Sequence, residues 1–274
     1  MFRGHNRRSG SLRSVWHRRE RKRRPLDPRA APDLIEQPRP TVRYRYRPTE
    51  AEWQSGDPGT MLRCLVRLAT DRGIVFHMPR LAVQRKLRLF YCACCRLRWD
   101  VLPAAGREAV EVVERYADGL ATAKHLRAAR RSAEAVVRAT RPVWAAGGFA
   151  PGAWDATTTA HLVVNAAEVH ARLRAGSVPG GGPAGAADQA ALLRELFADP
   201  FRPVEIADRW LTGTVAALAR VIHADRAFEL MPVLGDALQD AGCESAAVLG
   251  HCYGPGPHTA GCWLVDRLAG YDSA

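Results

Sequence analysis

The chain has 274 residues, of which 47% are hydrophobic, 25% charged and 7% aromatic. This composition is typical of a globular protein with one or two domains, and it excludes a fibrous or wholly disordered chain. The longest apolar runs are shorter than the roughly 18 residues that a transmembrane helix needs, so the sequence predicts no membrane span.

The formal net charge of +12 is concentrated at the N-terminus. Residues 1–48 contain 15 Lys/Arg and 4 Asp/Glu, whereas residues 49–274 contain 25 and 24. The segment also holds six prolines and few apolar residues, so we expect a disordered tail. Its arginines could contact phosphates and its aromatic residues could stack on bases. Because the rest of the chain is nearly balanced in charge, any nucleic-acid binding is expected only through residues 1–48. A solvated basic tail and a start codon assigned upstream of the true one are the two alternatives.

Order is expected to begin at Thr49, because Thr49 and Glu52 have the spacing of a capping box. The apolar positions over 61–69 predict a second helix, and a break follows over 71–79. Residues from Leu81 to about Val101 are apolar around most of a helical circumference, so they predict a central, buried helix.

An amphipathic pattern over 106–140 predicts a surface helix that Gly119 can divide in two, and residues 157–174 predict a further helix. Residues 175–187 contain five glycines and two prolines, and we interpret them as a linker or long loop. This segment would separate a helical N-terminal part, 49–174, from a helical C-terminal part, 188–274.

The sequence of the C-terminal part predicts a series of short helices. Thr212 is placed to cap one helix, and Pro232 suits the first turn of the next. Two final helices are expected over 245–252 and 258–268, separated by a Gly/Pro connector over 253–257. Because strand-type alternation is nearly absent, the predicted fold class is all-α, a multi-helix globular body with a disordered basic tail.

Four residues have the spacing of a metal site. Cys92 and Cys95 lie one helical turn apart in the predicted central helix, and His258 and Cys262 lie one turn apart in the predicted last helix. Two such pairs would supply three sulfurs and one nitrogen for a structural zinc ion. Alternatively, the cysteines are packing residues, since free cysteine is among the most buried residue types.

Enzymatic function has little support in the sequence. Cys92 or Cys252 could pair with His251 or His258 as nucleophile and base, but no orienting group or oxyanion hole accompanies them. Gly-rich nucleotide-binding loops and hydrolase or kinase signatures are absent. The sequence leans against an enzyme and identifies no catalytic residue.

Two segments are distinctive: residues 85–96, RKLRLFYCACCR, and residues 251–263, HCYGPGPHTAGCW. They resemble segments of a family of planctomycete hypothetical proteins, and the resemblance covers most of residues 49–274. Members of that family often begin at the segment that corresponds to residues 49–53, which agrees with an upstream-assigned start. Because the family has no assigned activity, the resemblance implies domain boundaries and no function.

The first functional hypothesis is a nonenzymatic helical module that binds an unknown protein partner or has a regulatory role. We expect a cytoplasmic location, because the Arg-rich start lacks the apolar segment of a signal peptide. The Arg, Pro, Ala and Gly of the tail are residues that GC-rich DNA encodes, so we expect a bacterium with a GC-rich genome. The odd number of cysteines, seven, also favours reduced thiols. The second hypothesis is a zinc-stabilised protein, and the third is nucleic-acid binding through the tail.

Overall fold

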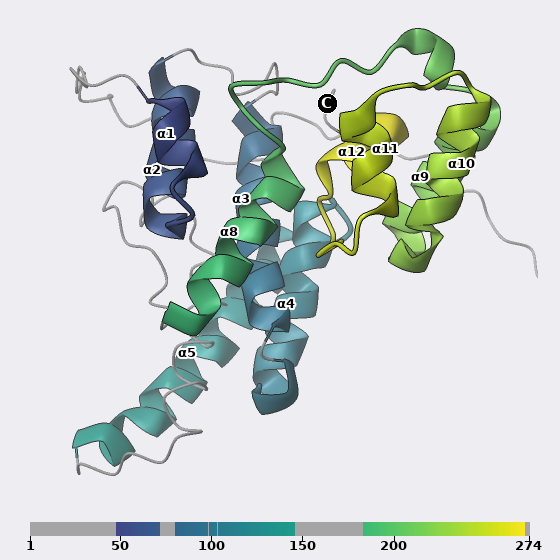
Figure 1. Ribbon diagram of the computed structural model, residues 1–274. Coiled ribbons are helices and arrows are strands. Elements are labelled where there is room, and N and C mark those ends of the chain that lie inside the picture. The colour runs from purple at the N-terminus through teal and green to yellow at the C-terminus, as the bar shows by residue number, and fades with distance from the viewer. Residues whose placement is uncertain (1–47, 72–79, 98, 103, 146–182, 272–274) are drawn as a thin grey trace, which may run out of the picture. The chain divides into compact units, whose positions relative to one another are not determined.

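The computed structural model describes residues 48–71, 80–97, 99–102, 104–145 and 183–271 (Figure 1). All regular elements in these ranges are helices, which confirms the all-α prediction. The tail over 1–47, the predicted helix over 157–174 and the first part of the predicted linker lie outside the described residues. In the part of the chain that is described, no helix is both long and apolar enough to cross a membrane.

The N-terminal elements follow the sequence pattern closely. They are α1 (Glu50–Gln54), α2 (Pro58–Asp71), α3 (Arg80–Arg96), the short 3-10 helix η1 (Trp99–Val101), α4 (Ala104–Ala117) and α5 (Ala123–Ala145). The predicted capping box is confirmed: the Thr49 N–H donates to the Glu52 carboxylate at 2.9 Å, and the Glu52 N–H donates to the Thr49 hydroxyl at 3.3 Å. Gly119, with a φ of +71°, lies in the turn that separates α4 from α5, as predicted.

The C-terminal elements are α8 (Pro183–Phe197), η2 (Asp208–Trp210), α9 (Gly213–Asp225), η3 (Phe228–Leu230), α10 (Met231–Asp240), α11 (Ala246–Tyr253) and α12 (Trp263–Ala269). Thr212 caps α9 and Pro232 lies in the first turn of α10, and both predictions are confirmed. The first helix differs from expectation, because α8 begins at Pro183 and makes residues 183–187 of the predicted linker helical.

The prediction of where the last helix begins is wrong. The helix begins at Trp263 rather than at residue 258, and Cys262 is its N-cap residue, with a non-helical backbone. Gly256 and Gly261 have φ values of +91° and +90°, a left-handed backbone that a continuous α-helix does not contain. Consequently His258 and Cys262 do not share one face of a helix, although the sequence spacing suggested that they would.

Two apolar clusters form the interior of the described part of the chain. The first surrounds α3, whose predicted central position is confirmed, and includes Phe90 and Tyr91 with side chains from α1, α2, α4, α5 and α8. The second is formed by α9–α12 and includes Ile222, Leu234 and Leu264. Helix α3 ends at Arg96 rather than at Val101, so the buried helix is shorter than the sequence pattern predicted.

Three buried carboxylates join helices of one cluster to those of the other. Glu114, in α4, accepts hydrogen bonds from Arg96 of α3 at 2.6 and 2.7 Å and pairs with Arg226, directly after α9, at 2.9 Å. Asp266, in α12, pairs with Lys86 of α3 at 2.9 Å and also with Arg85. The third, Glu195 in α8, is described below. Because a buried carboxylate without a partner costs several kcal/mol, these pairs constrain how the clusters meet.

Arg85 extends the contact around Asp266 into a network. Its guanidinium donates to Asp118 at 2.8 and 3.0 Å and lies 3.1 Å from Nε2 of His223. The ring of Tyr271 stacks on His223 with a centroid separation of 3.7 Å. Residues from α3, α9, α12 and the turn after α4 therefore share one polar network.

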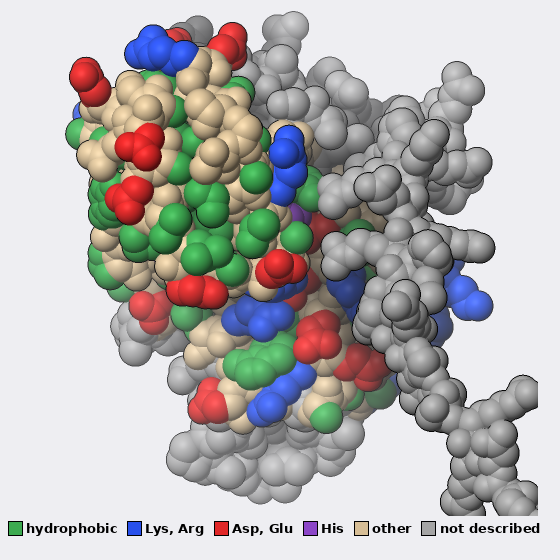
Figure 2. Space-filling view, turned by 90° about the vertical axis from the view of Figure 1, so that its right-hand side faces the viewer, with side chains coloured by type: hydrophobic (Ala, Val, Ile, Leu, Met, Phe, Trp, Pro, Cys, Tyr) green, Lys and Arg blue, Asp and Glu red, His purple; other side chains and the backbone are tan. Residues whose placement is uncertain are grey.

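The face that includes α9 and α10 carries apolar side chains among scattered charges (Figure 2). The larger exposed ones in the C-terminal half are Leu211, Val221, Val233 and Tyr253. Exposed apolar residues are common on folded proteins, so these side chains do not by themselves define a binding surface.

Asp266 generates a prediction about acid stability. Burial by itself raises the pKa of a carboxyl, but the charges of Lys86 and Arg85 outweigh burial and lower the pKa of Asp266 to about 2. Its contribution to stability is therefore complete above about pH 4 and is lost as the pH falls from about 4 to 2. We expect Asp266→Asn to destabilise the metal-free protein by roughly 2–4 kcal/mol at neutral pH, and by progressively less below pH 4.

Denaturant unfolding of both proteins across this pH range, with a chelator present, measures the difference. The exposed Asp240→Asn variant is the matched control and should show no such dependence. A destabilisation by Asp266→Asn that stays constant from neutral pH to pH 2 would contradict the assignment.

Candidate metal centre

Four potential ligands converge at one place in the interior. One donor atom from each of Glu195, His251, His258 and Cys262 lies within 4.8 Å of all the others. We refer to these four residues as the EHHC cluster. Glu195 and Cys262 are buried, and the side chains of His251 and His258 are only 15% and 11% exposed. Among the described residues, no other group of three or more such side chains is arranged to hold a metal.

Two of the four residues are carried by helices. Glu195 lies in the last turn of α8, where its neighbours Leu193, Leu196 and Phe197 are buried in the first apolar cluster. His251 lies in the last turn of α11, whose next residue, Cys252, is buried in the second cluster. The apolar packing of each helix therefore fixes the position of its polar residue.

The other two residues belong to the connector between α11 and α12. Its backbone runs very close to the first cluster at Gly261, where a Cβ would lie 2.9 Å from Leu89 Cδ1 and 3.5 Å from Leu196 Cδ2. Cys262 follows directly and caps α12, with its carbonyl accepting the Asp266 N–H at 3.0 Å. This close approach, at a residue whose φ of +90° favours glycine, brings the Cys262 thiol to Glu195.

The donor atoms are close to one another. His251 Nε2 lies 3.1 Å from Cys262 Sγ and 3.6 Å from Glu195 Oε2, and His258 Nδ1 lies 3.4 Å from Glu195 Oε1. The His251 ring packs against His258 and Trp263 at centroid separations of 5.0 and 5.1 Å. The two imidazoles are thus held in fixed orientations with one nitrogen of each directed at the carboxylate.

The charge states of the cluster follow from burial and from Glu195. Burial lowers the pKa of His251 despite the nearby carboxylate. The hydrogen bond from His258 to Glu195 raises the pKa of His258 against the effect of burial. Burial, together with the charge of Glu195, raises the pKa of the Cys262 thiol. Without a metal the cluster therefore contains a neutral His251 and a protonated thiol at neutral pH.

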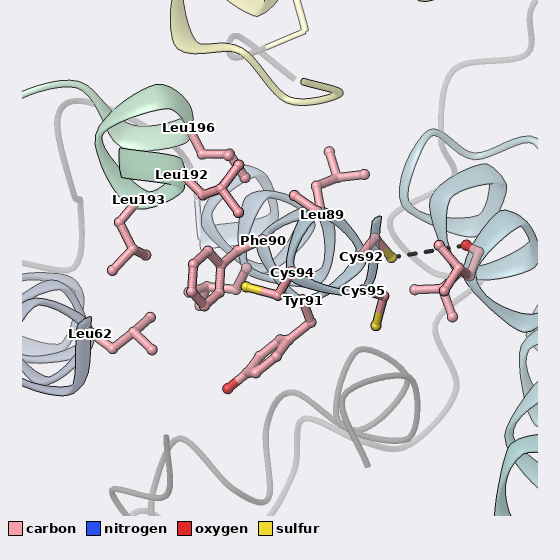
Figure 3. Packing of buried hydrophobic residues seen from close by; sticks show 14 of the residues in the cluster. Leu62, Leu89, Phe90, Tyr91, Cys92, Cys94, Cys95, Leu192, Leu193 and Leu196 are labelled. Carbon is pink, nitrogen blue, oxygen red and sulfur yellow. Dashed lines mark hydrogen bonds between the residues drawn. The ribbon is translucent and has the colours of Figure 1, made fainter. Parts of the chain in front are cut away.

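The structure brings together only half of the ligand set that the sequence suggested. His258 and Cys262 belong to the cluster, whereas Cys92 and Cys95 lie in the first apolar cluster, 1% and 0% exposed. The Cys92 thiol faces the carbonyl of Val110 in α4 at 3.9 Å (Figure 3). Burial raises the pKa of both thiols well above the ordinary value. All seven cysteines of the chain are buried, and none forms a disulfide.

Sequence reasoning missed Glu195 as a ligand, and it left His251 out of the ligand set, although His251 lies just across the Gly/Pro connector from His258. One signal for Glu195 was present: it stands in the segment Leu192-Leu193-Arg194-Glu195-Leu196-Phe197, where apolar residues surround it on a helix. A carboxylate in such a place must be paired when it is buried. The sequence did not reveal its partners, because they lie more than 50 residues away along the chain.

Comparison of the chain with family models, with curated proteins and with solved structures finds no significant match. The resemblance to a planctomycete family therefore stays a prediction, and the function must be argued from the geometry of the chain itself.

The cluster makes a prediction for Glu195→Gln in the metal-free protein. The variant removes the negative charge that raises the pKa of His258, so that pKa should fall. Because the pKa of His258 is raised in the folded state, the contact between His258 and Glu195 stabilises the protein at acidic pH. This stabilisation is lost as the pH rises through the folded-state pKa of His258. We therefore expect the variant to be more destabilising at about pH 5.5 than at about pH 8.

NMR titration of the His258 ring protons, with unfolding curves at the two pH values, tests both expectations. Glu205→Gln, which changes an exposed glutamate, is the control that should leave the His258 pKa unchanged. If Glu195→Gln also leaves that pKa unchanged, Glu195 is not the group that acts on His258.

Proposed function

We propose that the protein binds one zinc ion through the EHHC cluster and that this ion has a structural role. The observation that carries the proposal is the convergence of four donor atoms, from α8, α11, the connector and the N-cap of α12, within 4.8 Å of one another. Zinc accepts nitrogen, sulfur and carboxylate oxygen ligands, which is the donor set that these residues offer.

The spacing of the donors supports a four-coordinate ion. Around a tetrahedral zinc with bonds of about 2.0–2.3 Å, ligand atoms are roughly 3.3–3.8 Å apart. Three separations, 3.1, 3.6 and 3.4 Å, lie close to this range, and the last two join His251 and His258 to different oxygens of Glu195. The four donor atoms lie within 4.8 Å of one another, so side-chain shifts would bring them to tetrahedral spacing around the ion.

The balance of charge also supports a cation at this place. Glu114 and Asp266, the two other buried carboxylates that join the clusters, are each paired with arginine or lysine. Glu195 is instead surrounded by two imidazoles and a thiol, and burial keeps one of these imidazoles neutral. A divalent ion would supply a positive charge that does not depend on protonation of His258, and would favour the thiolate form of Cys262.

Four protein ligands and low exposure favour a structural ion over a catalytic one. Catalytic zinc sites keep one position open for water or substrate, whereas structural sites are filled by the protein. The ion would connect α8, which packs in the first apolar cluster, to α11 and α12 of the second. Partner binding by the helical body, nucleic-acid binding through residues 1–48 and a cytoplasmic location stay predictions.

Metal content is the direct test. The full chain, purified without a metal-affinity tag, should contain about one zinc per molecule, and chelation should lower its melting temperature. Cys262→Ser and Glu195→Gln should each lose most of the metal, because each removes a ligand.

Cys92→Ala and Cys95→Ala are the matched controls, since they change buried cysteines that lie outside the EHHC cluster. Both variants should keep the full metal content. Loss of zinc from the Cys95 variant but not from Glu195→Gln would instead favour the ligand set suggested by the sequence. Absence of metal from the wild-type chain, even after incubation with zinc, would refute the proposed function.

Zinc binding should also release protons in a way that identifies its ligands. Because burial and Glu195 raise the pKa of Cys262, this thiol must lose its proton when zinc binds at neutral pH. Below the raised pKa of His258, a second proton must leave, so the affinity should rise more steeply with pH there than at higher pH. Calorimetry in buffers of different ionisation enthalpy measures the number released by the wild-type protein, and at least one proton per zinc is expected at neutral pH.

A further inference from the structure

Lys86 of α3 contacts the backbone beside one proposed metal ligand. Its side chain is fully buried, and Nζ donates to the Gly261 carbonyl at 3.0 Å and to Asp266 Oδ2 at 2.9 Å. Gly261 directly precedes Cys262, and Asp266 lies one helical turn after it. One ammonium group therefore holds the chain on both sides of this ligand.

The backbone around Cys262 has little freedom to move. The Asp266 N–H donates to the Cys262 carbonyl at 3.0 Å, which closes the first turn of α12. Gly261 lies against Leu89, which is one turn after Lys86 on α3, and against Leu196, which follows Glu195 on α8. Lys86 and Leu89 of α3 therefore both contact the chain at Gly261, directly before Cys262. At the same point the chain also contacts α8 beside Glu195.

We propose that Lys86 is a positioning residue of the zinc site, which couples metal binding to the docking of α12 on α3. The inference rests on the proposed zinc function and extends it to a residue that does not bind the metal. Groups that orient metal ligands typically change affinity by about 10- to 100-fold when they are removed. Because such coupling is reciprocal, bound zinc should also tighten the contact between Lys86 and Gly261.

The test compares variants of the full chain by metal affinity. Lys86→Met keeps the length of the side chain and removes its donors, so we expect the affinity for Zn²⁺ and Co²⁺ to fall by about 10- to 100-fold. Competition with a chromophoric chelator measures the affinity. The stoichiometry should stay at one metal per chain, and the thiolate-to-cobalt absorption should persist, since the ligands are unchanged. Lys124→Met, on the exposed side of α5, should behave as wild type.

Glu114→Gln separates positioning from general destabilisation. It disrupts a different buried ion pair, with Arg96 and Arg226, and does not change the contacts of Lys86 with Gly261 and Asp266. We expect Glu114→Gln to bind metal with nearly wild-type affinity at a temperature where the metal-free forms of both variants are folded. Equal losses of affinity in the two variants would mean that affinity follows stability, and would overturn the proposal.

A measurement on the wild-type protein covers the case in which Lys86→Met does not fold. The ammonium protons of Lys86, followed by NMR with labelled lysine, should exchange more slowly with water when zinc is bound. Unchanged exchange would overturn the coupling, as would wild-type affinity in Lys86→Met. Failure of the wild-type chain to bind metal at all is a different outcome, because it removes the proposed function itself.

Discussion

A carboxylate that is taken out of water needs a positive partner, and this requirement governs how the helices of this protein meet. Glu114, Glu195 and Asp266 are buried, and each has partners on helices or connectors of the other apolar cluster. The apolar residues make each cluster compact, but apolar packing is not directional. The orientation of the clusters therefore depends on ion pairs and hydrogen bonds, which require defined distances between defined atoms.

The proposed zinc site uses the same principle with a different cation. Arginine is always charged, so Glu114, which pairs with Arg96 and Arg226, and Asp266, which pairs with Arg85, need nothing further. Histidine and cysteine are conditional partners, because their charge depends on pH and on metal. Metal availability can therefore affect the contact at Glu195 while the contacts at Glu114 and Asp266 stay unchanged.

Local features of the fold were predictable from the sequence, and the site was only partly so. Thr49, Thr212, Pro232 and Gly119 act through neighbouring backbone, so their roles follow from residues a few positions away. The helical pairing of His258 with Cys262 failed because Gly261, which lies between them, has a φ of +90° and packs closely against Leu89 and Leu196. Glu195 was missed as a ligand because its partners come from distant segments, and a hydrophobic pattern carries no information about which segments meet.

The division of the interior into two apolar clusters also bears on the cooperativity of unfolding. Heat-capacity changes on unfolding come mainly from exposing apolar surface, and most of that surface here lies within one cluster or the other. Separation of the clusters would break the ion pairs that join them. Each cluster is therefore a candidate for a separate unit of partial unfolding, in which these buried charges would become exposed to water.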